Sequence, residues 1–116
     1  MKSGHIEIFV SDPMKARGFY VDVLGFTLVQ IQGDQFVWLT LEDQSFLLRP
    51  SKNQNRVEFY DQSKIGLVLY TENLKEKRAE LESRGLKFED PDMFEGCLTF
   101  QDPDGNWFQL VDPNNH

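Results

Sequence analysis

The chain has 116 residues, 40% of them apolar, and its formal net charge at pH 7 is −7. This length suits one hydrophobic core, so we expect a single domain over residues 1–116. The acidic balance disfavours a nucleic-acid partner, because phosphates are bound chiefly by Lys and Arg. The one cysteine, Cys97, cannot form a disulfide within the chain, and no run of about 20 apolar residues predicts a membrane span. We therefore expect a cytoplasmic protein with no membrane partner, in which Cys97 is a small buried side chain.

The first half of the chain predicts a strand, a helix and three further strands. Apolar and polar residues alternate over His5–Val10, as in a half-buried strand. Asp12 is placed to cap a helix whose first residue is Pro13 and which extends to Val23. Turn residues then separate three β-rich runs, which are Phe26–Gln32, Gln35–Leu41 and Ser45–Arg49.

The same order of elements returns about 60 residues later. A strand is expected over Ile65–Tyr70, and Asn73 is placed to cap a helix over Leu74–Arg84. Three short strands follow, at Leu86–Glu89, Leu98–Phe100 and Trp107–Val111. The sequence therefore predicts two βαβββ modules, at 1–50 and 64–113, joined by a polar linker at 51–63. Within this linker the pattern of Arg56–Tyr60 leaves open whether a short strand forms.

Two stretches carry a resemblance that covers nearly the whole chain. They are DPMKARGFYVDVLGF at Asp12–Phe26 and FQDPDGNWFQL at Phe100–Leu110. Placed in this order around the repeated module, they resemble the signature of the vicinal oxygen chelate superfamily, which comprises glyoxalases, bleomycin resistance proteins and extradiol dioxygenases. The resemblance implies an α+β fold in which two tandem βαβββ modules form a curled mixed sheet around a cavity.

The resemblance also implies where a metal would be held. Ligands in this superfamily come from the first and last strands of each module, which here places them at His5, Gly66, Gln109 and one of Phe46, Leu47 and Leu48. Only His5 and Gln109 have side chains able to coordinate, and two weakly matched side chains rarely hold a divalent metal. We therefore expect no metal and no cofactor.

In one alternative, the protein binds a divalent metal. Glu7 lies two residues after His5 on the same strand face and could supply the missing carboxylate. The chain would then be a metal-dependent lyase or dioxygenase that uses His5, Glu7 and Gln109, with His5 and Glu7 as its candidate catalytic residues.

Period-2 alternation predicts which strand residues line the cavity. The side packed on helices is expected to carry Leu39, Leu41, Leu98, Phe100, Phe108 and Leu110. The other side then carries Thr40, Thr99 and Val68 together with the residues that we expect to bind a ligand, which are Glu7, Phe9, Phe36, Trp38, Tyr70, Trp107 and Gln109. Aromatic walls with few polar groups are typical of small-molecule pockets, and Glu7 beside them suits a cationic ligand.

Three functions fit these features. The first is a protein that sequesters an aromatic or cationic amphipathic molecule without metal, the second is the metalloenzyme described above, and the third is an interaction module whose two tryptophans fill the cavity.

We also expect a homodimer. The resemblance implies that short chains pair the first module of one subunit with the second module of its partner, so that His5 faces Gln109.

Overall fold

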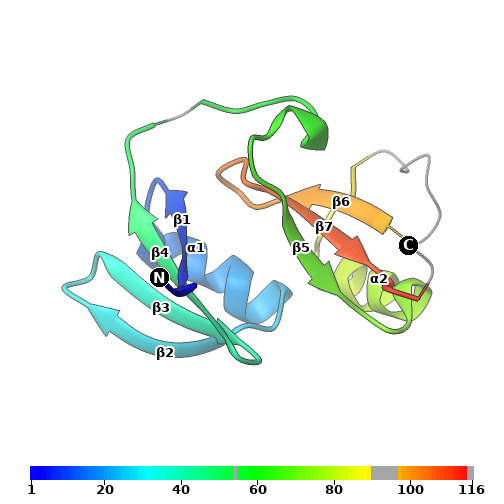
Figure 1. Cartoon of the computed structure of the whole chain (residues 1–116), viewed down its shortest axis with the longest axis horizontal. Helices are drawn as coiled ribbons and strands as arrows, with labels where there is room; N and C mark the ends of the chain where they lie inside the picture. The colour runs from blue at the N-terminus through cyan, green and yellow to red at the C-terminus, as the bar shows by residue number, and fades with distance from the viewer. Residues whose placement is uncertain (54, 90–96, 115–116) are drawn as a thin grey trace. The chain divides into compact units, whose positions relative to one another are not determined.

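The computed structural model describes residues 1–53, 55–89 and 97–114. The chain forms two compact units, Met1–Gln54 and Asn55–His116, and Figure 1 shows a β-sheet with helical segments in each. Sheets of four and three strands confirm the expected α+β class. Among the described residues, no helix has both the length and the apolar character that crossing a bilayer requires.

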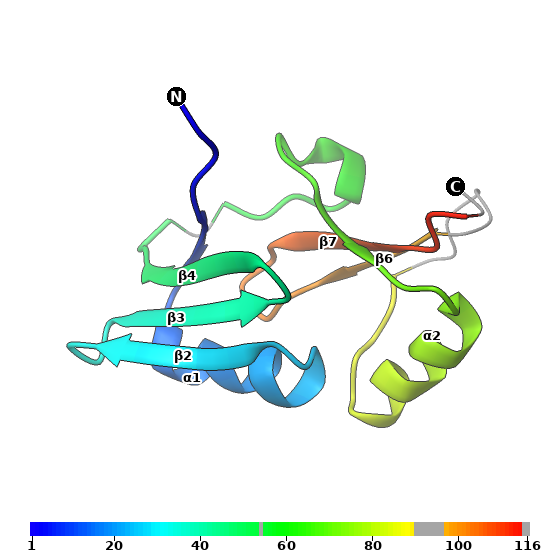
Figure 2. The same ribbon diagram turned by 60° about the horizontal axis from the view of Figure 1, so that its bottom comes forward.

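The first unit contains a four-stranded sheet in the order β1-β4-β3-β2, with β1 and β4 parallel and the other neighbours antiparallel. Its elements are β1 (Ile6–Val10), α1 (Pro13–Gly18), the π-helical turn η1 (Phe19–Val23), β2 (Thr27–Gln32), β3 (Phe36–Leu41) and β4 (Gln44–Pro50). α1 packs against β3 and β4 on one face of this sheet (Figure 2). The βαβββ order predicted for this module is confirmed.

The predicted helix from Pro13 to Val23 is confirmed, but its second half is π-helical. A carboxylate oxygen of Asp12 caps the start by accepting hydrogen bonds from the backbone N–H groups of Met14 at 3.0 Å and Lys15 at 3.4 Å. At the other end the N–H of Leu24 donates to the carbonyl of Phe19, five residues back, at 3.0 Å. The register of the hydrogen bonds therefore changes within one helical run.

The second unit contains a three-stranded sheet in the order β5-β7-β6, with β5 parallel and β6 antiparallel to β7. Its elements are the 3-10 turn η2 (Tyr60–Gln62), β5 (Leu67–Tyr70), α2 (Leu74–Ser83), β6 (Cys97–Gln101) and β7 (Trp107–Val111). The helix after Asn73 is thus confirmed, and the segment left open in the linker ends in a 3-10 turn instead of forming a strand.

The strand expected at Leu86–Glu89 is wrong. This segment makes one backbone hydrogen bond to the sheet, from the N–H of Glu89 to the carbonyl of Thr99 at 2.9 Å. Side chains anchor it instead, because Leu86 is buried and the ring of Phe88 lies 5.7 Å from that of Phe100. Apolar packing thus holds the segment without a ladder of strand hydrogen bonds, and the described part of the second unit has three strands instead of four.

Most of the apolar core lies on one side of each sheet. Of the six residues predicted to pack on helices, Leu41 is half-buried and the other five are buried, namely Leu39, Leu98, Phe100, Phe108 and Leu110. Phe100 and Phe108 stack with their ring centroids 5.2 Å apart. Cys97, on the other face of its sheet, is buried as expected. Since side chains alternate along a strand, the remaining residues of each strand lie on the other face of its sheet.

Candidate functional site

The face of the first sheet turned away from α1 gathers five of the residues singled out from the sequence. We call it the first aromatic face, and it consists of His5, Glu7, Phe9, Phe36, Trp38, Leu47 and Arg49. The strand register places Glu7 beside Leu47, and Leu47 beside Trp38. Residues from β1, β3 and β4 therefore meet on one side of the sheet.

A polar network joins His5, Glu7 and Arg49 on this face. The Nε2 atom of His5 lies 2.8 Å from one carboxylate oxygen of Glu7, and Arg49 donates from Nη1 to the other oxygen at 2.9 Å. The hydrogen bond with His5 and then that with Arg49 lower the pKa of Glu7. A carboxylate with a lowered pKa is a weaker base, and the guanidinium group compensates its charge.

Aromatic rings occupy the rest of the face. The rings of His5 and Trp38 meet edge to face with centroids 4.7 Å apart, and the indole N–H of Trp38 donates to the side-chain oxygen of Gln32 at 3.1 Å. The guanidinium carbon of Arg49 lies 5.9 Å from the centroid of the Phe36 ring. Phe9 is 52% exposed. These rings offer apolar surface in an orientation fixed by their neighbours.

An open hollow of about 430 Å³ adjoins this face. Its lining residues are Ser3, Gly4, His5, Trp38, Asp43, Gln44 and Ser45. The volume falls within the roughly 300 to 1,000 Å³ that small-molecule sites span. One carboxylate, that of Asp43, and two aromatic or heteroaromatic rings, those of His5 and Trp38, are thus available to one bound molecule.

The residues of the first unit do not fit a resident divalent metal. The register resolves which residue holds the fourth ligand position, because Leu47 pairs with Glu7 in the way that Gln109 pairs with Val68. Leu47 is apolar and cannot coordinate. Over residues 1–53, 55–89 and 97–114, no group of three His, Cys, Asp or Glu side chains is placed to hold a metal ion. Two neighbours on one strand, His5 and Glu7, fall short of the three protein ligands typical of catalytic zinc.

The corresponding face of the second sheet has two different ends. We call it the second aromatic face, and it consists of Val68, Tyr70, Cys97, Thr99, Trp107, Gln109 and Val111. Val68 and Tyr70 are 46% and 74% exposed, whereas Trp107 is only 4% exposed. Gln109 lies between Val68 and Thr99 in the sheet. The structure therefore places all seven predicted ligand-binding residues on the two aromatic faces, but it buries one of them, Trp107.

The residues that cover Trp107 were not singled out from the sequence. Its indole N–H donates to the carbonyl of Val57 at 3.1 Å, and the ring of Tyr60 lies edge to face with its own at 6.4 Å. Both residues come from the stretch interpreted as a linker. No alternation or motif in that stretch signals a contact with a residue 50 positions away.

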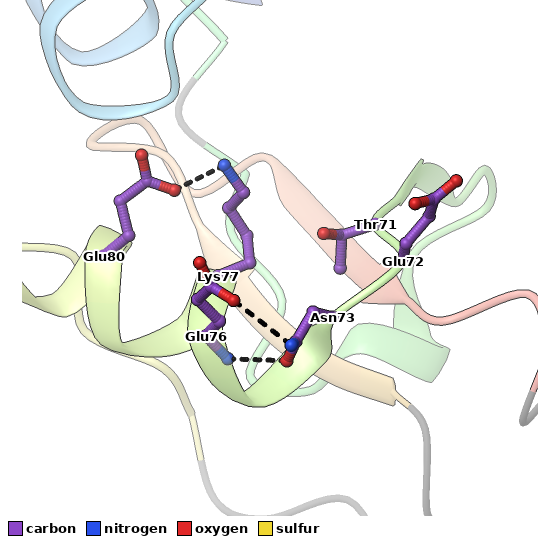
Figure 3. Close-up of a pocket in the computed structure, with 6 residues that line it drawn as sticks. All are labelled: Thr71, Glu72, Asn73, Glu76, Lys77 and Glu80. Carbon is purple, nitrogen blue, oxygen red and sulfur yellow. Dashed lines mark hydrogen bonds and ion pairs between the residues drawn. The ribbon is translucent and has the colours of Figure 1, made fainter.

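A second hollow lies at the start of α2, and four of its six lining residues pair with one another (Figure 3). Asn73 accepts a hydrogen bond from the N–H of Glu76 at 3.0 Å and donates to its carboxylate at 3.2 Å. Lys77 pairs with Glu80. These contacts cap and brace the helix.

The family model for the Glyoxalase/Bleomycin resistance protein/Dioxygenase superfamily matches residues 2–110. The chain belongs to this superfamily. A comparison with curated proteins found no match. Among solved structures, the chain is similar to TnmS3, an antibiotic binding protein from Streptomyces, with 28% identity, a TM-score of 0.70 and coverage of 97% of this chain and 98% of that one.

Two further structures share the fold at lower identity. A glyoxalase family protein from Bacillus anthracis is 17% identical, with a TM-score of 0.74 and coverage of 97% of this chain and 94% of that one. A lactoylglutathione lyase from Agrobacterium tumefaciens is 19% identical, with a TM-score of 0.69 and coverage of 97% and 95%. Because superfamily members of one fold thus include binding proteins and enzymes, the side chains of the site must distinguish between these functions.

Proposed function

We propose that this protein binds an aromatic small molecule on the first aromatic face and does not transform it. The observation that carries the proposal is the clustering of Phe9, Phe36 and Trp38 on one side of the sheet, next to an open hollow of about 430 Å³. The likeness to an antibiotic binding protein at 28% identity supports the same class of function.

The polar groups of this face favour binding over catalysis. A general base must hold a pKa near the working pH, whereas the pKa of Glu7 is lowered by its hydrogen bonds with His5 and Arg49. The metal that would activate a substrate lacks a fitting set of ligands in the described part of the first unit. The described residues of this face therefore supply recognition groups but not the set of metal ligands that a lyase or dioxygenase of this superfamily would use.

The chemistry of the face defines the class of ligand. Glu7 and Arg49 compensate each other, so stacking on Trp38 and Phe36 contributes more than net charge. An amphipathic ligand would stack through its ring system and place a cationic group near Asp43, which lines the hollow and is exposed. This matches an aromatic or cationic amphipathic molecule of drug size.

A fluorescence screen tests the proposal. Trp107→Phe leaves Trp38 as the reporter, and aromatic and cationic amphipathic compounds, glycopeptide antibiotics included, are titrated into this variant. We expect at least one compound to quench Trp38 with low micromolar affinity. In the otherwise wild-type chain, Trp38→Ala should weaken binding of that compound by about two-fold to ten-fold, measured by calorimetry, because stacking contributes about 0.5 to 1.5 kcal/mol beyond area burial.

Phe59→Ala is the matched control, since Phe59 is an exposed aromatic residue that belongs to the second unit. It should leave the affinity unchanged. Equal weakening by both substitutions, or no response of Trp38 to any compound, would contradict the proposal. Elemental analysis of the same preparation distinguishes the metalloenzyme, for which about one transition metal ion per site is required.

A further inference from the structure

A stretch of the chain itself lies over part of the second aromatic face. We call residues Arg56–Gln62 the covering segment. Its Val57 carbonyl accepts the indole N–H of Trp107 at 3.1 Å, and its Tyr60 ring lies edge to face with the indole at 6.4 Å. Trp107 is 4% exposed as a result, whereas Tyr70 at the opposite end of the same face is 74% exposed.

The covering segment is anchored to the β6–β7 turn at one end and is braced by its own hydrogen bonds. At one end Arg56 donates to the carbonyl of Pro103 and packs on Gly105, where a Cβ atom would lie 2.9 Å from the Arg56 Cγ atom. Gly105 has a φ of +88°, which glycine adopts without strain. Within the segment, the side-chain oxygen of Gln62 accepts the N–H groups of Glu58 and Phe59, each at 2.9 Å. The segment thus has a defined conformation held against the β6–β7 turn.

Tyr60 fits a space that exists because residue 66 is glycine. A Cβ atom built on Gly66 would overlap the hydroxyl oxygen of Tyr60 and lie 3.0 Å from its Cζ atom. The corresponding position in the first unit is His5, whose side chain lies on the first aromatic face against Trp38. In the second unit, therefore, the phenol ring of Tyr60 fills the space that a side chain at position 66, the counterpart of His5, would otherwise occupy.

The surroundings of the phenol agree with this placement. Burial raises the pKa of Tyr60, and Cys97 on the second aromatic face adds to the shift. The raised pKa is the direction expected of a hydroxyl that is partly withdrawn from solvent.

We infer that the covering segment occupies the Trp107 end of the second aromatic face in place of a ligand. The absence of a side chain at Gly66 leaves the space in which Tyr60 packs. Tyr60 and a side chain at position 66 exclude each other, so the second unit cannot present both. Trp107 is thereby withheld from ligands, and Trp38 is the tryptophan open to them. The inference needs no assumption about what the first aromatic face binds.

Accessibility of Trp107 tests the inference without any ligand. In the Trp38→Phe background Trp107 is the sole tryptophan, and its quenching by acrylamide measures its exposure. Gly66→Ala should raise the quenching constant at least three-fold, because the added methyl group displaces Tyr60. Gly4→Ala is the matched control, since a Cβ there meets nothing within 4 Å, and it should leave the constant unchanged.

Two further variants keep the test decisive if Gly66→Ala lowers the yield of folded protein. Tyr60→Ala should raise quenching of Trp107 to a similar extent, whereas Tyr60→Phe, which keeps the ring, should preserve most of the protection. Combining Tyr60→Phe with Gly66→Ala should restore part of the protection lost in Gly66→Ala, because the overlapping oxygen is gone. The inference is overturned if Tyr60→Ala leaves Trp107 protected, or if Gly66→Ala and Gly4→Ala behave alike. Either result would leave ligand binding at Trp38 unaffected, so the two proposals fail separately.

Discussion

The carboxylate of Glu7 lies between two partners on the first aromatic face. His5 precedes it by two residues, directly before β1, and Arg49 reaches it from β4. The pKa of Glu7 is lowered by the bond with His5 first and by Arg49 second. Ion pairs this exposed contribute little to stability, so the role of the pair is to hold the polar end of the face in a fixed and nearly neutral arrangement.

The lowered pKa of Glu7 predicts a specific dependence of stability on pH. Because the folded-state value lies below the ordinary 4.5, the stabilisation is fully present above about pH 4.5 and is lost as the pH falls through the lowered value. Glu7→Gln should therefore flatten the fall in melting temperature between neutral and acidic pH. Thermal unfolding followed by circular dichroism at several pH values measures this, with Glu72→Gln on an exposed loop as control. A profile for Glu7→Gln that coincides with wild type would contradict the prediction.

The turn between β6 and β7 is built around one buried side chain. Asp102 is 3% exposed, and its carboxylate accepts the backbone N–H groups of Asp104 at 2.9 Å and Asn106 at 2.8 Å, as well as the side-chain N–H of Asn106 at 2.8 Å. The turn also receives Arg56 through Pro103 and Gly105. This element therefore orients β7 and anchors the covering segment at once.

Removal of the Asp102 carboxylate should destabilise the protein markedly. Asp102→Ala leaves three donors without their acceptor, which costs about 2 to 3 kcal/mol. Urea unfolding at neutral pH measures the loss, and Asp102→Asn, which keeps one side-chain oxygen, should lie between Ala and wild type. If Asp102→Ala proved as stable as wild type, the turn would not depend on these hydrogen bonds.

At the scale of the whole molecule, two units of related topology each leave apolar side chains exposed. Phe9 and Val29 of the first unit and Val68 and Tyr70 of the second are all at least 46% exposed. Exposed apolar side chains on the outer strands of a sheet are candidates for a ligand-binding or protein interface. Paired subunits would remove part of this apolar surface from water, as in other closed two-fold assemblies.

We accordingly predict a homodimer. Multi-angle light scattering at micromolar concentration should give twice the 13.6 kDa of one chain. Val68→Asp, which adds a charge to the exposed part of the second aromatic face, should shift the mass toward that of a monomer. A wild-type protein that elutes as a monomer at this concentration would contradict the prediction.

The sequence by itself determined the features that depend on near neighbours. Alternation predicted β1, β3 and β7, and the caps Asp12 and Asn73 predicted where both helices begin, because a cap bonds to N–H groups two or three residues away. The same alternation separated the core side of each sheet from its other face. The internal repeat and the two motif stretches were sufficient to predict the superfamily, which the family model then showed.

The tertiary structure decided what depends on residues far apart in the chain. Arg49 meets Glu7 across 42 positions, and Val57 meets Trp107 across 50 positions. No local period encodes such contacts, since they arise only once the sheets have formed. Alternation correctly assigned Trp107 to the face away from the core, but only the folded chain shows that Tyr60 covers it, because the space left at Gly66 is a property of two segments brought together.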